Sequence, residues 1–134
     1  DIGEEDTPKQ AGLSFAVDYN KPEFIGRDAL LRERDAGVPT KRLVQFKLPE
    51  GSRDMLYHEE PIWKDGQIVG SITSGGYGHR LERSMGMGYV NCTDGVTKDF
   101  LASGGFEIEI ACARIPAEPS LQPFLDPKNT RIKA

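Results

Sequence analysis

Apolar and polar residues alternate with a period of two over most of the chain after residue 40. In the first such stretch, 43–48, Val44, Phe46 and Leu48 fall on one face, and the opposite face is mostly polar. Similar short apolar stretches follow at 61–64, 67–72, 85–91, 106–112 and 115–121. This alternation is typical of strands with one buried face. The sequence therefore predicts about six strands between residue 39 and the end of the chain.

Turn residues separate these stretches, and one turn has a specific signature. Asp65-Gly66 stands between 61–64 and 67–72, and this dipeptide suits the tight turn of a β-hairpin, which needs positive φ at both central positions. The chain also contains 15 glycines and 9 prolines, which favours short strands over long helices. We predict a mainly β fold, a small antiparallel β-barrel of about six strands, because closure removes exposed sheet edges.

The pattern before residue 39 is different. Leu13, Phe15 and Val17 alternate with smaller or polar residues, which predicts a strand. Strong helix formers then fill a helix near 26–36, which Gly37 is suited to end. Val38-Pro39-Thr40 reads as a rigid joint. The barrel is therefore expected to be preceded by a strand and one helix, with a boundary that divides the chain into 1–38 and 39–134.

Charge and composition exclude several classes of function. The 17 basic and 21 acidic residues give a net charge of −4 and are mixed along the chain, so no basic stripe suggests a nucleic-acid partner. No run of eighteen apolar residues and no apolar leader is present, which predicts a soluble chain without a membrane or targeting segment. Cys92 and Cys112 lack the spacing of a zinc site and are expected to be buried or half-buried free thiols in a reducing compartment.

The glycine-rich stretch 70–80 is the most distinctive candidate for chemistry. Its amides and hydroxyls could cradle an anion, but it lacks Gly-Lys-Ser/Thr, and glycines that allow strands to approach closely are the favoured interpretation. The two histidines, His58 and His79, are interpreted as structural or surface residues. No Ser-His-Asp pattern and no metal-ligand spacing is visible. The residues alone thus predict a β-barrel domain and no reaction.

Several segments in order resemble one family. They are Asp6-Thr7-Pro8 with Ala11-Gly12-Leu13-Ser14-Phe15, the stretch 21–30 (KPEFIGRDAL), Lys41-Arg42-Leu43-Val44, the stretch 65–75 and Met87-Gly88-Tyr89-Val90. Together they resemble the carboxy-terminal part of the glycine-cleavage T-protein (aminomethyltransferase) superfamily. The stretches 59–63 (EEPIW) and 121–128 (LQPFLDPK) are more similar to its flavoprotein branch, the dimethylglycine and sarcosine dehydrogenases.

The resemblance implies a fragment of a larger one-carbon enzyme. In such proteins a flavin (FAD) domain oxidises an N-methyl group, and the T-protein-like part passes the carbon to tetrahydrofolate. Residues 1–38 would be the tail of the folate-binding domain and 39–134 the carboxy-terminal barrel. The flavin site and the acidic catalytic residue would lie upstream of Asp1, so the fragment would hold no catalytic residue and no metal, and would be inactive alone. Its implied partners are the preceding part of its own chain and an N-methylglycine-type substrate, in the cytoplasm or, in a eukaryote, the mitochondrial matrix.

Three residues are candidates for secondary contacts with the folate. The resemblance places an aromatic residue at Phe15, whose flat ring could pack on the pterin or aminobenzoyl rings. Tyr77 could lie at the edge of the site, and Arg42 could pair with the glutamate tail of folate. A purely structural role is the alternative for each of the three.

Two other functions stay open at this point. The parent could be a stand-alone aminomethyltransferase of the glycine cleavage system, without flavin. The barrel could also be a non-catalytic binding module, because a fold does not fix a function.

Overall fold

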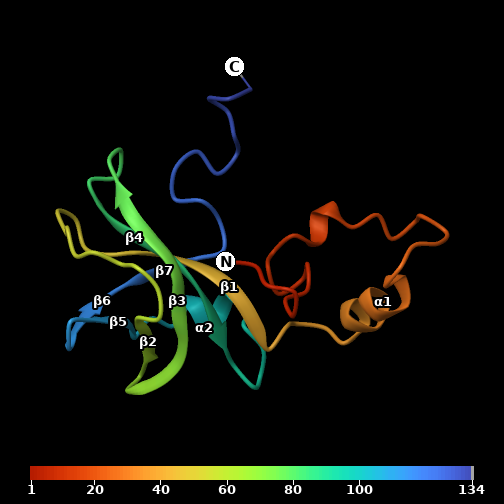
Figure 1. The fold of residues 1–134 in the computed structure, drawn as a ribbon, viewed down its shortest axis with the longest axis horizontal. Helices are drawn as coiled ribbons and strands as arrows, with labels where there is room; N and C mark the ends of the chain where they lie inside the picture. Colours follow the sequence, from red (N-terminus) through yellow and green to blue (C-terminus); the bar gives the residue numbers. More distant parts are fainter. Residues whose placement is uncertain (134) are drawn as a thin grey trace.

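The computed structural model describes residues 1–133, in which a curled antiparallel sheet carries a small lobe on one side (Figure 1). The strands are β1 (Lys41–Lys47), β2 (Pro61–Lys64), β3 (Gln67–Gly78), β4 (Arg83–Asn91), β5 (Phe106–Ile110), β6 (Ala113–Pro116) and β7 (Glu118–Ser120). The helices are α1 (Arg27–Asp35), α2 (Lys98–Ala102) and the 3₁₀ turn η1 (Ser14–Ala16).

One continuous segment lies at both edges of the sheet and thereby closes it. The strand order is β6-β5-β2-β3-β4-β1-β7, and only Ala117 separates β6 from β7 in the sequence. The amide of Ala117 donates to the carbonyl of Phe106 at 3.0 Å, so the segment follows β5 before it crosses to β1. The predicted mainly β barrel is confirmed. It has seven strands because the strand predicted at 115–121 is divided at Ala117.

The core lies inside this curled sheet. The predicted inward face of 43–48 is confirmed, since Val44 and Phe46 of β1 are fully buried and Leu48, just after β1, is 1% exposed. The ring of Phe46 packs against that of Phe106 with 5.9 Å between centroids. Burial of each such side chain stabilises the fold by about 1.5–3 kcal/mol.

The close approach of β3 to β4 depends on glycine. A Cβ added to Gly70 would lie 1.8 Å from the carbonyl oxygen of Tyr89, which is far inside van der Waals contact. The favoured interpretation of the glycine-rich stretch is therefore confirmed, because most of it lies in β3. The predicted β2–β3 turn is also confirmed, since Asp65 and Gly66 both have positive φ, 49° and 82°.

Helix α2 was not predicted from the sequence. It begins after Thr97, whose hydroxyl accepts a hydrogen bond from the amide of Phe100 at 3.0 Å, as an N-cap does. Leu101 then packs into the barrel core, together with the half-buried ring of Phe100. The helix covers part of the barrel next to β7.

Residues 12–38, here called the lobe, contain the predicted helix but not the predicted strand. Helix α1 at 27–35 confirms the helix near 26–36. The strand predicted over 13–17 is wrong: Ala16 and Val17 donate to carbonyls three residues earlier, which makes the turn η1. In the described chain no strand pairs with this segment, and an alternating pattern without a sheet edge to join does not form a strand.

Candidate functional site

A groove of about 950 Å³ lies beside helix α2. One wall is α2 with Lys98 and Leu101, and the other is the segment after β6, with Ala117 and Leu121. The start of β1 contributes Arg42. The groove therefore lies where the barrel is closed by α2 and by its last strand.

The charge in this groove is mostly positive. Its lining in residues 1–133 includes the basic side chains Arg42, Lys47, Arg83 and Lys98 and a single acidic one, Glu118. Lys47 pairs with Glu118 at 3.0 Å, and Arg83 pairs with Glu50 at 3.3 Å. No ion pair engages Arg42 or Lys98 in the part of the chain that the structure describes. An anionic ligand would thus find two free cations here.

Arg42 is the predicted site residue that lines this groove. It occupies the second position of β1, opposite the buried Val90 of β4. Its Nε atom is buried and has no hydrogen-bond partner among the described residues. A buried donor without a partner is costly, about 1–3 kcal/mol. The Arg42 side chain as a whole is only half-buried and lines the groove, so a carboxylate there could pair with its guanidinium. The arrangement thus fits a ligand that carries carboxylates.

Tyr77 lies elsewhere, in a second and smaller hollow. It stands near the end of β3, where it and Met85 line a space of about 320 Å³. The ring of His79 packs edge-on against that of Tyr77 at 5.1 Å, and the guanidinium of Arg53 lies 5.8 Å from the Tyr77 centroid. Arg42 is not among the residues that line this second hollow.

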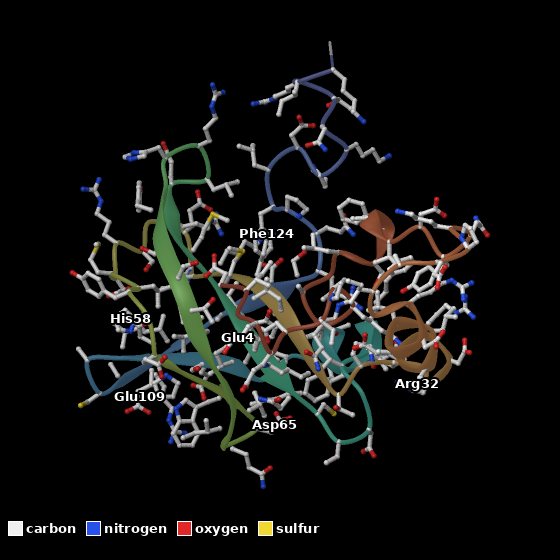
Figure 2. The ribbon with its side chains drawn as sticks, turned by 45° about the vertical axis from the view of Figure 1, so that its right-hand side comes forward. Glu4, Arg32, His58, Asp65, Glu109 and Phe124 are labelled. Carbon is white, nitrogen blue, oxygen red and sulfur yellow. The ribbon has the colours of Figure 1, made fainter. Side chains whose placement is uncertain are left out.

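Phe15 lies in the lobe and lines neither hollow. It is the second residue of η1, and 85% of it is exposed. Its ring is free to pack against another surface, but this chain does not bring it together with Arg42 and Tyr77 into one site. In Figure 2 the lobe with Arg32 lies on the right, whereas Glu109 and His58 lie on the left side of the barrel.

The remaining candidate groups form no second centre. His58 is exposed on the loop before β2, and His79 packs against Tyr77. Cys92 and Cys112 are free thiols; Cys92 is half-buried as predicted, but the prediction is wrong for Cys112, which is exposed on the β5–β6 turn. Residues 1–133 contain no group of three or more His, Cys, Asp or Glu side chains placed to hold a metal ion. Among the same residues, no helix has the length and apolarity that a membrane crossing requires.

Sequence reasoning missed Lys98 and the helix that carries it. The signal was present, because Thr97 precedes a short stretch with Asp99, and a hydroxyl residue with an acid in the next turn is typical of a helix start. Five residues are too few for a visible period, so the helix escaped notice. The groove beside it, which depends on Leu121 and Ala117 as well, could not be inferred without the fold.

This chain is similar to known proteins of one family. Residues 41–126 match the glycine cleavage T-protein C-terminal barrel domain. The aminomethyltransferase T of the glycine cleavage system from Bartonella henselae has a similar structure, with a TM-score of 0.70 and 27% sequence identity. That match covers 87% of this chain and 31% of the other.

Two similar sequences belong to longer enzymes. The 4-methylaminobutanoate oxidase (formaldehyde-forming) of Paenarthrobacter nicotinovorans is 38% identical over 99% of this chain. The mitochondrial sarcosine dehydrogenase of Homo sapiens is 32% identical, also over 99% of this chain. The chain spans only 15% and 14% of the length of these relatives.

Proposed function

Because this chain belongs to the glycine cleavage T-protein family, of which it carries the C-terminal barrel, we propose that it is the closing part of a longer folate-dependent one-carbon enzyme. The part of that enzyme outside these residues would supply the acidic catalytic group. The barrel and the lobe would add contacts to tetrahydrofolate and keep water from its pocket. The isolated chain would then have no turnover of its own.

The observation that carries this proposal is the half-buried Arg42, which lines a cationic groove and has no ion-pair partner among residues 1–133. Tetrahydrofolate ends in a glutamate whose carboxylates could accept hydrogen bonds from a guanidinium, and such charge-assisted bonds are stronger than neutral ones. Lys98 lines the same groove and would add a second positive charge. Phe15 would lie against a ring of the ligand or against the domain that holds it. Tyr77 is the weakest candidate, since it lines the other hollow.

Within the family, we place the parent in the flavin-dependent branch of N-methyl oxidising enzymes, of the dimethylglycine and sarcosine dehydrogenase type. Two similar proteins are named as a sarcosine dehydrogenase and a 4-methylaminobutanoate oxidase, and each aligns with 99% of this chain. FAD would bind in the parent outside these 134 residues. The compartment would be the cytoplasm of a bacterium or the mitochondrial matrix.

A stand-alone aminomethyltransferase is the second candidate, and the similarity to the Bartonella henselae structure favours it. The length of the parent separates the two. This chain covers 15% of the oxidase, and its match covers 31% of the aminomethyltransferase. A parent of the shorter kind, without bound flavin, would select the aminomethyltransferase.

The test is a titration of the parent enzyme with tetrahydrofolate. Arg42→Gln should weaken binding by at least about tenfold, because the substitution removes a charge-assisted contact worth about 1.5–3 kcal/mol. Arg114→Gln is the matched control, since the guanidinium of Arg114 stacks on the ring of Trp63 at 3.4 Å and does not line the groove. Equal affinity in all three proteins would refute the role of Arg42. No binding at millimolar ligand would instead favour a non-catalytic module.

A further inference from the structure

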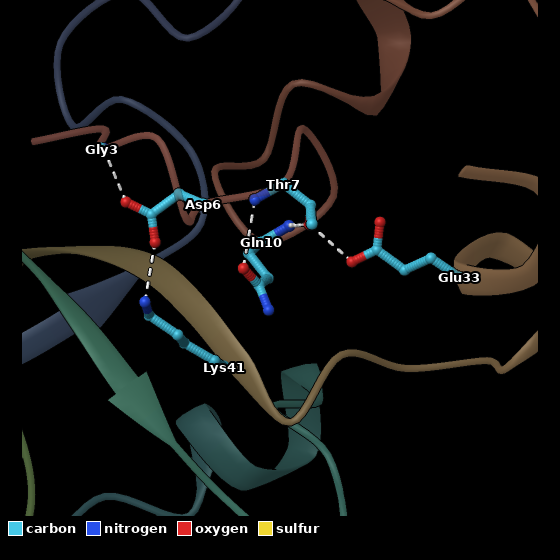
Figure 3. A network of polar contacts seen from close by, with 6 residues as sticks. All are labelled: Gly3, Asp6, Thr7, Gln10, Glu33 and Lys41. Carbon is cyan, nitrogen blue, oxygen red and sulfur yellow. Dashed lines mark hydrogen bonds and ion pairs between the residues drawn. The ribbon is translucent and has the colours of Figure 1, made fainter. Parts of the chain in front are cut away.

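Residues 3–10, here called the strap, connect two parts of the molecule that are far apart in the sequence (Figure 3). On the lobe side, the hydroxyl of Thr7 donates to the carboxylate of Glu33 at 2.5 Å, and the ammonium of Lys9 donates to the backbone carbonyl of the same residue. A weaker contact joins Lys9 to the carbonyl of Arg34 at 3.4 Å. The strap is therefore bonded to the last turn of α1.

The other side of the strap is bonded to β1. The carboxylate of Asp6 accepts a hydrogen bond from the ammonium of Lys41 at 2.7 Å, and its second oxygen accepts one from the amide of Gly3 at 2.7 Å. Four residues further along, the carbonyl of Gln10 accepts a hydrogen bond from the amide of Leu43 at 2.8 Å. The strap thus occupies the free edge of β1 next to Arg42.

Helix α1 itself contributes little packing that could hold it in place. None of its nine residues is buried. Apolar side chains of the lobe are open to solvent instead, with Ile25 fully exposed and Phe15 at 85%. Its Leu30 and Leu31 are only half-buried, so the polar contacts of the strap tie the helix to the barrel beside the covalent joint at 36–40.

The contact between Asp6 and Lys41 has the features of an anchor. The side chain of Asp6 is only 9% exposed, and the ammonium of Lys41 also lies 4.5 Å from the ring centroid of Tyr89. The hydroxyl of Tyr89 is buried and has no hydrogen-bond partner among the described residues. The side chain of Lys41 is 37% exposed, so only the acid of this pair is buried. Removing Lys41 would leave the buried carboxylate of Asp6 without its cation.

Strand β1 carries a second lysine of the same kind, which gives a comparison within one element. Lys47 pairs with Glu118 at 3.0 Å and lies 4.9 Å from the ring centroid of Phe124. Its partner Glu118 is 64% exposed, however, so water solvates this pair and its contribution is small. Both lysines lie on β1 and pair with a carboxylate. The two pairs differ in the burial of that carboxylate, since Asp6 is 9% exposed and Glu118 is 64% exposed.

We propose that the strap is a conformational coupling device: the anchor between Asp6 and Lys41 fixes where the lobe lies relative to the Arg42 groove, and its release frees the lobe while the barrel stays folded. Because Arg42 directly follows Lys41, the anchor and the groove share one stretch of backbone. The coupling needs no ligand, so it holds or fails independently of the folate proposal.

The experiment is hydrogen exchange of the 134-residue chain without ligand, with Lys41→Met against wild type. The amide of Leu43 is the direct reporter, since it belongs to the barrel but donates to the strap. Its exchange, and that of the α1 amides, should become about tenfold faster, while amides of β4 keep their protection. Lys47→Met, the matched control, should leave Leu43 and α1 unchanged.

A second variant, Asp6→Asn, keeps the barrel sequence intact and should reproduce the effect of Lys41→Met. Unchanged exchange at Leu43 in both variants would overturn the proposal. Faster exchange throughout the barrel, β4 included, would also overturn it, because the strap would then be part of the barrel's own cooperative unit. If Lys41→Met fails to fold, the exchange rate of the Leu43 amide in Asp6→Asn decides the question.

Discussion

The barrel and the lobe differ in how their apolar side chains are used. In the barrel, Phe46, Ile62 and Ile72 are fully buried inside a sheet whose two edges share one segment. In the lobe, Ile25 and Phe15 are almost entirely exposed. A structure that buries its apolar groups can hold itself together, whereas one that exposes them gains little from folding alone. The barrel is therefore self-supporting, and the lobe is suited to a surface outside these residues.

The largest expected effect is a contrast between two phenylalanines. Phe46→Ala should lower the free energy of unfolding by about 4 kcal/mol, because it leaves a cavity in a packed core. Phe15→Ala should change it by less than about 0.5 kcal/mol, because the ring is exposed. Urea unfolding of the two variants measures both values. Equal losses would show that the lobe has a core of its own.

A smaller effect is expected at the β5–β6 turn, which lies in the barrel. Ala111 and Cys112 both have positive φ, 48° and 65°, although neither is glycine. The double substitution Ala111→Asn and Cys112→Gly suits this backbone better and should raise the free energy of unfolding by about 1 kcal/mol. Hydrogen exchange in α1 should not change. A gain in protection there would mean that the two parts unfold together.

The matching control lies at the β2–β3 turn. Gly66 already has the positive φ of 82° that this turn needs. Gly66→Ala should therefore destabilise the barrel by about 1 kcal/mol, the opposite sign. If both turns respond alike, backbone strain is not the cause.

The smallest effects concern pH and the strap. The hydrogen bond from Lys41, followed by that from the Gly3 amide, lowers the pKa of Asp6 below its usual 3.8. A lowered carboxyl pKa stabilises the folded state above pH 3.8 and loses this contribution as the pH falls through the lowered value. A pH below 3.8 should therefore release the strap before the barrel unfolds. The check is the hydrogen-exchange rate of the Leu43 amide, measured from pH 5 downwards and corrected for the pH dependence of intrinsic exchange. If the Leu43 amide lost protection at the same pH as the β4 amides, this prediction would be contradicted.

Tyr89, which lies beside Lys41 of the anchor, makes the stability depend on pH in the alkaline range as well. Burial, and then the negative charge of Asp6, raises the pKa of Tyr89 from 10.0 to about 12. The neutral ring is thus favoured in the folded state, and its contribution is complete below pH 10 and is lost between pH 10 and about 12. Tyr89→Phe should remove this step from an alkaline unfolding curve. An identical curve for the variant would show that Tyr89 does not titrate in that range.

The barrel strands could be predicted because each carries its own signal. The alternation of Val44, Phe46 and Leu48 and the Asp65-Gly66 turn are local, and the fold keeps both. The strand predicted over 13–17 failed because alternation describes only one half of a pairing, and the described chain offers no edge to join. The division of 1–38 from 39–134 stays a prediction, although the strap bonds the first ten residues to β1.

The site was harder to predict for a physical reason. Arg42 was named from the resemblance, but its unpartnered Nε depends on strands that pair across nearly fifty residues. The ion pair of Asp6 with Lys41 joins residues 35 apart, and no spacing rule connects them. Lys98 needed a five-residue helix that has no period of its own. Local sequence patterns predict helices and strands, whereas the groove and the ion pair depend on contacts between residues that are far apart in the sequence.

The most direct test of the account is a structure of the parent enzyme with bound tetrahydrofolate. In it, the guanidinium of Arg42 should lie within hydrogen-bond distance of a folate carboxylate. The exposed side chains of Phe15 and Ile25 should be covered by the ligand or by the preceding domain. A folate whose carboxylates lie away from the groove, with the lobe still open to solvent, would contradict it.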